Sequence, residues 1–174
     1  MPNAASAARD VMRVSENGLA LVKAFESCMA AVRTRPGFFK PYRDSAGVLT
    51  IGWGHTNHHL PRFDGNTIWS QQQCDDALAR DMQVFERWVR DHAMVALMQH
   101  EFDALASWSF NTGGPASATL WKKLNGGDRA AIPAELAKWN RAGGRVLAGL
   151  VRRRKAEGLL FAGRVAEALK VANN

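Results

Sequence analysis

Two carboxylates and one hydroxyl in the first third of the chain have the types and spacing that acid–base chemistry requires. Glu26 ends a stretch of helical periodicity, Asp44 opens a turn, and Thr50 follows that turn. The unpaired carbonyls at a helix end disfavour a charged glutamate, so Glu26 is suited to donate a proton. An aspartate in a wetter turn stays ionised, and such a pair can cleave a glycosidic bond. On residue types alone, a surface glutamate and a structural turn aspartate would be the commoner interpretation.

The elements that must position these groups centre on residues 42–56, which read Y-R-D-S-A-G-V-L-T-I-G-W-G-H-T. Residues 44–47 have the composition of a turn, because Asp and Ser bond nearby backbone and Gly47 accepts a positive φ. The following residues alternate as in a strand, with Val48 and Thr50 on one side and Leu49 and Ile51 on the other. Glycines inside a strand often mark a close backbone approach, as we expect around Trp53.

The order of these motifs resembles the phage-type lysozymes, glycoside hydrolase family 24, which include the T-even and lambdoid endolysins. The resemblance rests on a glutamate at the end of a first helix followed by Y-x-D-x-x-G-x-x-T-x-G-x-G-H-T. It covers roughly residues 15 to 163, with motifs in the same order along the chain. The later motifs are Phe102–Leu105, Ser109–Gly113, Ser117–Leu120, Leu124–Asp128, Trp139–Gly144, and Gly149–Arg154 with Glu157.

The resemblance implies a muramidase that hydrolyses the β-1,4 bond between N-acetylmuramic acid and N-acetylglucosamine in peptidoglycan. In this family the glutamate, here Glu26, is the general acid, and the residues matching Asp44 and Thr50 order the attacking water with inversion. The resemblance also places Asn111 and Thr112 as substrate-binding residues in the sugar cleft. An arginine from the 152–154 run would pair with the glutamate, although the run itself does not say which one. No cofactor is implied.

The segment between the two carboxylates departs from the family. Seventeen residues separate Glu26 from Asp44, about twice the usual number, and the extra ones lie within residues 27–36. The five residues between Asp44 and Thr50 match the family spacing. We predict that the insertion is an excursion that leaves the catalytic pair facing one cleft. Inversion would then place the two carboxyl groups roughly 6.5–9.5 Å apart.

The predicted fold class is α+β and lysozyme-like: a mainly helical lobe and a small antiparallel β-hairpin lobe joined by a long helix. We expect a flexible leader over residues 1–13 and a single domain over 14–174. Within it, the hairpin lobe covers about 40–66 and the helical lobe about 70–172, together with a first helix at 15–26. Ser70 and Gln73 predict a capping box at the start of the long helix. Further helices are expected at 99–111, 117–124, 128–141 and 147–160.

The composition indicates which kinds of partner the protein can bind. The 174 residues carry 23 Lys and Arg against 16 Asp and Glu, a formal charge of +7 that attracts polyanions. We expect peptidoglycan as the partner, no nucleic acid, no stable membrane insertion, and a monomer. No signal peptide or membrane span is evident, so we expect synthesis in a host cytoplasm and action on the wall after a membrane lesion.

Metal and disulfide chemistry receive little support. His55, His58 and His59 form an H-x-x-H-H pattern, but no carboxylate stands at ligand spacing in this loop, so no metal is predicted. Cys28 and Cys74 are the only cysteines. They make no disulfide framework, and we expect both to be reduced, with a bridge between them left as the alternative.

Two rival functions remain open. If the insertion separates the carboxylates, Glu26 alone could cleave the glycan without water, as a lytic transglycosylase does. The chain could instead be a non-catalytic, cationic wall-binding protein, whose binding would fall with salt and survive Glu26→Gln. A nucleic-acid-binding function has less support than either rival, because no known nucleic-acid-binding motif accompanies the positive charge.

Overall fold

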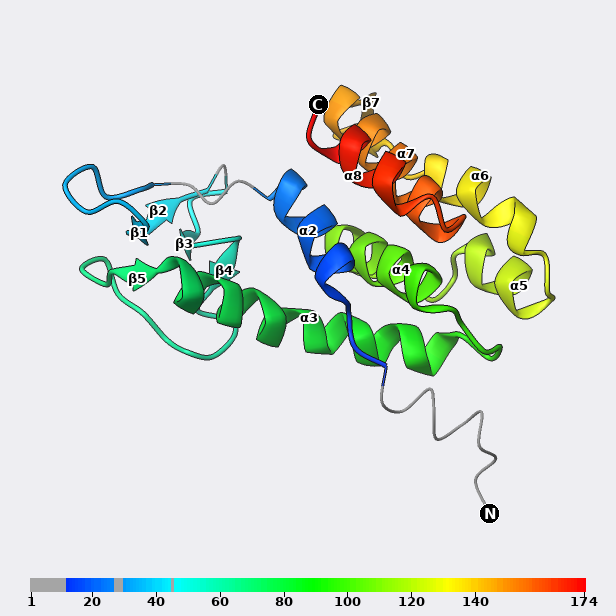
Figure 1. Ribbon diagram of the computed structural model, residues 1–174, viewed down its shortest axis with the longest axis horizontal. Coiled ribbons are helices and arrows are strands. Elements are labelled where there is room, and N and C mark those ends of the chain that lie inside the picture. Colours follow the sequence, from blue (N-terminus) through cyan, green and yellow to red (C-terminus); the bar gives the residue numbers. More distant parts are fainter. Residues whose placement is uncertain (1–11, 27–29, 45) are drawn as a thin grey trace, which may run out of the picture. The chain divides into compact units, whose positions relative to one another are not determined.

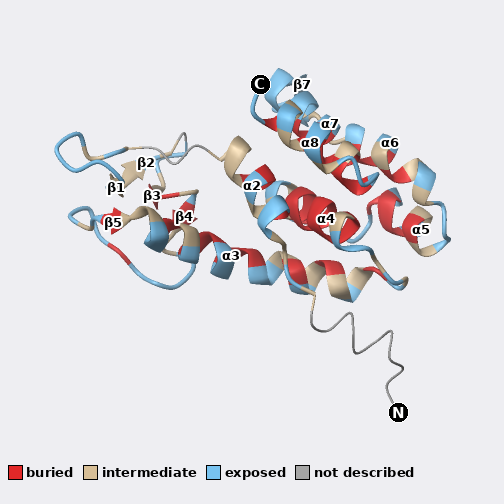
Figure 2. Ribbon diagram, viewed as in Figure 1, coloured by how far each residue is buried: buried red, intermediate tan, exposed pale blue. Residues whose placement is uncertain are grey.

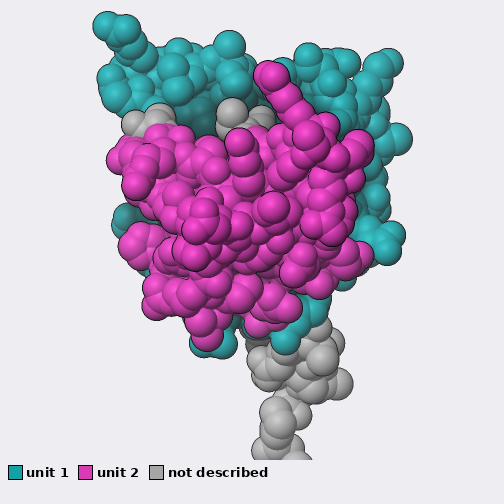
Figure 3. All heavy atoms as spheres, turned by 90° about the vertical axis from the view of Figure 1, so that its left-hand side faces the viewer, with its two compact units in different colours: residues 1–25, 84–174 teal, residues 26–83 magenta. Residues whose placement is uncertain are grey.

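The computed structural model describes residues 12–26, 30–44 and 46–174 (Figure 1). One compact unit contains Met1–Phe25 and Val84–Asn174, and the other contains Glu26–Gln83 (Figure 3). Helices predominate in the first unit and short antiparallel strands in the second, so the predicted α+β class is confirmed. None of the described helices is both long and apolar enough to cross a bilayer.

The first unit is built from helices and one hairpin. It contains α2 (Glu16–Phe25), the second part of α3 (Gln71–His92), α4 (Gln99–Thr112), α5 (Thr119–Asn125), η1 (Arg129–Ala131), α6 (Ile132–Ala137), β6 (Arg141–Ala142), β7 (Arg145–Val146), α7 (Ala148–Phe161) and α8 (Val165–Ala172). The helices predicted near residues 15–26, 99–111, 117–124 and 147–160 are confirmed within a few residues.

Helix α4 forms the core of this unit. Every residue from Glu101 to Ser109 is buried, and the helix packs against α2 and α7 (Figure 2). Apolar and small residues make up most of this stretch, as expected for a helix buried on all sides, but Glu101 and Asp103 are buried with them. It ends where predicted, because Gly113 adopts φ 79° and its N–H donates to the Ser109 carbonyl at 2.8 Å.

The helix predicted to run from residue 128 to 141 is wrong at its C-terminal end. Helix α6 stops at Ala137, and β6 and β7 follow as a two-stranded hairpin. Gly143 and Gly144 have φ values of 55° and 75°, and two successive positive φ angles are what a two-residue hairpin turn requires. The glycine pair therefore reverses a β-ribbon as well as ending helical structure.

The second unit contains two small sheets. Strand β1 (Phe38–Phe39) pairs with β5 (Trp69–Ser70), and β2 (Tyr42–Arg43), β3 (Leu49–Ile51) and β4 (His55–Thr56) form a three-stranded antiparallel sheet in that order. One cluster of its buried apolar residues consists of Phe39, Ile51, Phe63, Trp69, Cys74 and Ala77. Cys74 is thus part of this core, whereas Cys28 lies outside the described residues.

The capping box predicted for the start of α3 is confirmed. The Ser70 N–H donates to the Gln73 side chain at 2.9 Å, and the Gln73 N–H donates to the Ser70 hydroxyl at 3.3 Å. These reciprocal bonds satisfy two donors that a helix start would otherwise leave unpaired. From this cap, α3 extends to His92 and contributes residues to both units.

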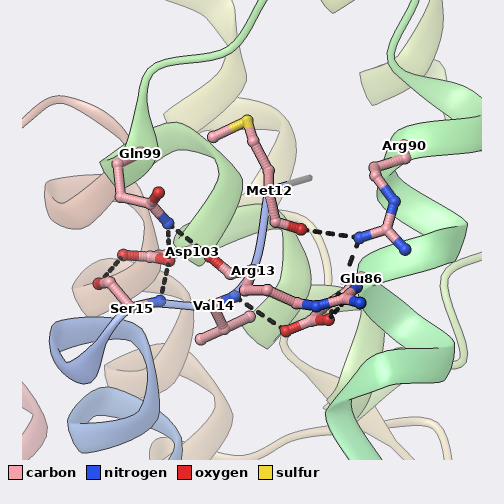
Figure 4. Close-up of polar contacts among 8 residues, drawn as sticks. All are labelled: Met12, Arg13, Val14, Ser15, Glu86, Arg90, Gln99 and Asp103. Carbon is pink, nitrogen blue, oxygen red and sulfur yellow. Dashed lines mark hydrogen bonds and ion pairs between the residues drawn. The ribbon is translucent and has the colours of Figure 1, made fainter. Parts of the chain in front are cut away.

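The N-terminal segment is tied to the helical unit from Met12 onward (Figure 4). Two buried carboxylates accept its backbone N–H groups at 2.9 Å: Glu86 binds Val14, and Asp103 binds Ser15. Arg90 donates to the Met12 carbonyl at 2.8 Å. Residues 1–11 of the expected leader lie outside the described residues.

A buried contact between a histidine and an aspartate joins β4 to α3. The two ring nitrogens of His55 lie 2.8 Å from Asp81 Oδ2 and 2.9 Å from the Pro61 carbonyl. Both partners are acceptors, so the arrangement is complete only when both nitrogens carry protons. Burial alone lowers the pKa of His55, but the hydrogen bonds to Asp81 and Pro61 outweigh it and raise the pKa above its ordinary value.

This pair should make stability depend on pH. His55→Asn should lower the free energy of unfolding by about 3 kcal/mol at pH 5.5, because a buried carboxylate loses its cation. Since the folded state has the higher pKa, the contribution is complete below the unfolded value and declines as pH rises through the folded one. Urea unfolding at pH 5.5 and 9 measures the difference. His58→Asn, at an exposed position of the same loop, is the matched control, and equal losses at both pH values would contradict the charge assignment.

Candidate active site

The turn before β3 fixes the Asp44 carboxylate. The backbone N–H groups of Ala46 and Val48 both donate to Asp44 Oδ1 at 2.9 Å. The turn itself closes when the Gly47 N–H donates to the Asp44 carbonyl at 2.9 Å, with Gly47 at φ 78° as predicted. Both of these bonds use Oδ1, so the described residues of the turn, 44 and 46–48, leave Oδ2 for a water or a substrate.

One carbonyl links Asp44 to Thr50. The Val48 carbonyl accepts the Asp44 N–H at 3.0 Å and the Thr50 hydroxyl at 3.0 Å. Thr50 is buried, so this bond holds its side chain in place. Because the hydroxyl proton is already donated, the Thr50 oxygen meets a ligand as an acceptor. A water could therefore donate one hydrogen bond to Thr50 and one to Asp44. These two bonds would orient the lone pair of the water.

Glycine keeps β3 close to α3 immediately after Thr50. Gly52 has φ 61°, and a Cβ atom there would lie 2.9 Å from both Cβ and Sγ of Cys74. The close backbone approach expected for this glycine is confirmed. Trp53 is held next to it, because its indole N–H donates to Asp75 at 2.6 Å. The strand that follows the Asp44 turn is thus supported from α3.

The insertion folds back on itself over residues 30–40. The Val32 N–H donates to the Phe38 carbonyl at 2.8 Å, and the Lys40 N–H donates to the Ala30 carbonyl at 3.1 Å. These bonds close a small hairpin, so the predicted excursion is confirmed for this part; residues 27–29 lie outside the described residues. Glu26 follows the last residue of α2 directly and is half-buried. The separation of its carboxyl from that of Asp44 stays a prediction.

Asn111 and Thr112 end α4 at the wall of a cavity of about 410 Å³. Its lining residues are Asn111, Thr112, Trp139, Arg141, Ala142, Leu147 and Leu150. The Thr112 hydroxyl donates to the Trp108 carbonyl at 2.8 Å, so toward a ligand it can only accept. Trp139 packs edge-on against Trp108 with ring centroids 5.4 Å apart, which combines a core contact with a place in the cavity wall.

The arginine run on α7 divides as expected for three successive helical positions. Arg152 is exposed, whereas Arg153 and Arg154 are buried beside Glu157. The guanidinium groups of Arg152 and Arg153 lie 5.5 and 5.4 Å from the Phe25 ring. Cations therefore gather at the end of α2, one residue before Glu26. The ion pair with Glu26 that the resemblance implies stays a prediction.

Two site features were missed by sequence reasoning. The first is the network of Glu157 with Arg153 and Arg154, which the i,i+4 and i,i+3 spacings on one helix could have revealed. The second is the contact of His55 with Asp81, which is 26 residues away in sequence. Together with the Pro61 carbonyl it engages both ring nitrogens, so neither is available to a metal. Among the described residues, no three His, Cys, Asp or Glu side chains gather as a metal site.

Comparison with known proteins gives one consistent result. The family model described as phage lysozyme matches residues 37–157. The endolysin of Acyrthosiphon pisum secondary endosymbiont phage 1 is 37% identical over 86% of this chain and 98% of its own length. The Bacillus phage PZA endolysin is 35% identical over 86% of this chain, which spans only 55% of that relative. A P22 lysozyme mutant structure aligns with TM-score 0.72 and 30% identity over 87% of this chain and 99% of that one.

The chain therefore belongs to the phage lysozyme family, and its fold is that of a lysozyme. The matched range contains Asp44, Thr50, Asn111 and Thr112, but it begins after Glu26. The substrate-binding role of Thr112 stays a prediction.

The close approach of Gly52 to Cys74 can be tested directly. Gly52→Ala should destabilise the protein by about 1–3 kcal/mol, because alanine is strained at φ 61° and its Cβ would collide with Cys74. Gly65→Ala is the control, since a Cβ there meets no neighbour and the backbone is unstrained. Urea unfolding of both variants gives the comparison. Equal stability of the two would show that the backbone of β3 can move away from α3 at no cost.

Proposed function

We propose that this peptidoglycan-cleaving lysozyme hydrolyses the β-1,4 bond between N-acetylmuramic acid and N-acetylglucosamine. Glu26 is the general acid, and Asp44 with Thr50 positions the attacking water. The observation that supports this most strongly is the Val48 carbonyl, which binds the Asp44 N–H and the Thr50 hydroxyl together. The turn thereby holds a carboxylate and an acceptor hydroxyl in one fixed arrangement.

The proposed reaction moves two protons. Glu26 gives its proton to the glycosidic oxygen as the bond from that oxygen to the anomeric carbon breaks. Water attacks the anomeric carbon from the opposite face of the ring and passes a proton to Asp44. Attack from this face inverts the configuration at the anomeric carbon. Thr50 accepts a hydrogen bond from the other O–H group of the water and so directs the attacking lone pair. No metal or cofactor takes part in this scheme.

The same geometry favours hydrolysis over the transglycosylase alternative. A transglycosylase closes the sugar on its own hydroxyl group and has no use for an ordered water. Here Asp44 is oriented by two backbone N–H groups and Thr50 by its bond to Val48. Such fixed groups suit a reaction in which water must be held before the bond breaks.

The surface charge supports the proposed place of action. A formal charge of +7 favours approach to the phosphate- and carboxylate-bearing polymers of a bacterial wall. We propose that the enzyme acts there as a monomer, after a lesion in the membrane has given it access to the wall.

Digestion of purified peptidoglycan, with mass analysis of the fragments, tests the mechanism. The native enzyme should release reducing-end muropeptides. Glu26→Gln should lower kcat by about 10²–10⁴-fold, because the leaving oxygen loses its proton donor. Asp44→Asn should slow release by weakening the hold on water while leaving the fold intact, because an amide oxygen still accepts the turn's N–H bonds.

The matched control is Glu16→Gln, which makes the same change at an exposed position in the first turn of α2. It should leave both rate and products unchanged. Anhydro-ended products would show that the enzyme is a transglycosylase and not a hydrolase. Wall binding without cleavage by the native protein, falling with salt, would instead establish the non-catalytic alternative.

A further inference from the structure

A completely buried carboxylate lies at the centre of the α4–α7 packing. Glu157 Oε1 accepts the Ser107 hydroxyl of α4 at 2.8 Å and the Arg153 Nε–H at 3.3 Å. Glu157 Oε2 lies 3.1 Å from Nε of Arg154, whose side chain is only 1% exposed. An ion pair so deeply buried confers little net stability, since desolvation offsets most of the attraction. Its value to the protein must then lie partly in what it holds in place.

The network ends at the cavity described above. Arg154 uses Nη2 to donate to Asn111 Oδ1 at 2.7 Å, and the same nitrogen lies 3.3 Å from Glu157 Oε1. Arginine has donors and no acceptor, so the amide oxygen of Asn111 must face it. This removes the usual freedom of an asparagine to rotate its amide by half a turn. The Asn111 NH₂ group is thereby fixed as the part that can donate to a ligand.

The cavity walls match one chemical group. Asn111 offers N–H donors, Thr112 offers an acceptor, and Arg141 adds a cation that also donates to the Gly144 carbonyl. Trp139, Ala142, Leu147 and Leu150 provide aromatic and apolar surface. A donor beside an apolar wall fits a group that combines a carbonyl oxygen with a methyl. The acetamido group of an N-acetylhexosamine has both.

We propose that Asn111 is a specificity-determining residue that donates a hydrogen bond to the acetamido carbonyl of a glycan ring, and that Arg154 is its positioning residue. Glu157 holds Arg154 in turn. The inference rests on the proposed function, because it assumes that an N-acetylated glycan is the substrate, and it adds the atom by which the acetyl group is recognised. It makes binding depend on an ion pair that never touches the substrate.

The test compares two forms of one wall polymer. Peptidoglycan is de-N-acetylated chemically and then either re-acetylated or thioacetylated, so that charge and shape match but sulfur replaces the carbonyl oxygen as a much weaker acceptor. The native enzyme should show a KM about 5–10-fold lower for the acetylated form, the usual effect of one hydrogen bond. In Asn111→Asp the ratio of the two KM values should approach one, because the carboxylate still accepts a hydrogen bond from Arg154 but has no N–H to donate.

Positioning by Arg154 is tested in a single variant. Arg154→Met removes the anchor of Asn111, while Glu157 keeps its ion pair with Arg153 and its bond from Ser107. It should lose the acetyl preference through KM, with kcat changed far less. Arg152→Gln, at the exposed neighbouring position, is the control and should keep the full ratio. A purely structural role for Arg154 would lower the amount of folded enzyme without changing the ratio.

Binding separates this inference from the proposed function. Co-sedimentation of the Glu26→Gln variant with both polymers gives dissociation constants whether or not the enzyme cleaves. Loss of the acetyl preference on adding Asn111→Asp supports the inference even if no cleavage is found. A preference that survives Asn111→Asp, in binding and in KM, overturns the inference and leaves the muramidase proposal intact.

Discussion

The burial of α4 is the constraint on which the helical unit depends. Nine consecutive residues of this helix are buried, and several of them are polar. A polar group removed from water is costly unless it has a partner, so a buried charge or hydroxyl favours a particular neighbour at a particular place. Three buried polar side chains of α4 have such partners: Asp103 with Ser15, Glu101 with Arg129, and Ser107 with Glu157. These three side chains each fix a different element: the start of α2, the η1 turn, or α7.

This arrangement explains why stability and substrate contact share residues in the helical unit. The bond from Ser107 to Glu157 is a core contact, yet Glu157 also binds Arg154, and Arg154 binds Asn111 at the cavity. Burial lowers the pKa of Arg154 below its usual value, although the Glu157 carboxylate beside it acts in the opposite sense. The guanidinium stays charged and donating, as arginine does in proteins. A rigid donor beneath an exposed amide restricts that amide's rotamers before any ligand arrives, which reduces the entropy lost on binding.

The parts of the fold that sequence reasoning found are those determined by local chemistry. The Ser70–Gln73 cap, the Asp44 turn and the helix end at Gly113 each depend on side chains or φ angles within a few residues. The β6–β7 hairpin was missed because a glycine pair ends a helix and turns a ribbon equally well. The contacts of Glu86 with residues 13 and 14 could not be predicted, because they join segments more than seventy residues apart.

The same distinction explains how an insertion can lie between two candidate catalytic residues. Asp44 and Thr50 are joined through Val48, so a residue added between them would change their hydrogen bonds. The inserted segment differs over its described part, because the backbone at Lys40 returns to Ala30. The Ala30 carbonyl and the Lys40 N–H are joined by a hydrogen bond of 3.1 Å, so the length of the loop between them has no effect on where the chain continues. A hairpin that closes on itself adds residues without adding displacement, and the residues between 30 and 40 therefore need not increase the distance from Glu26 to Asp44.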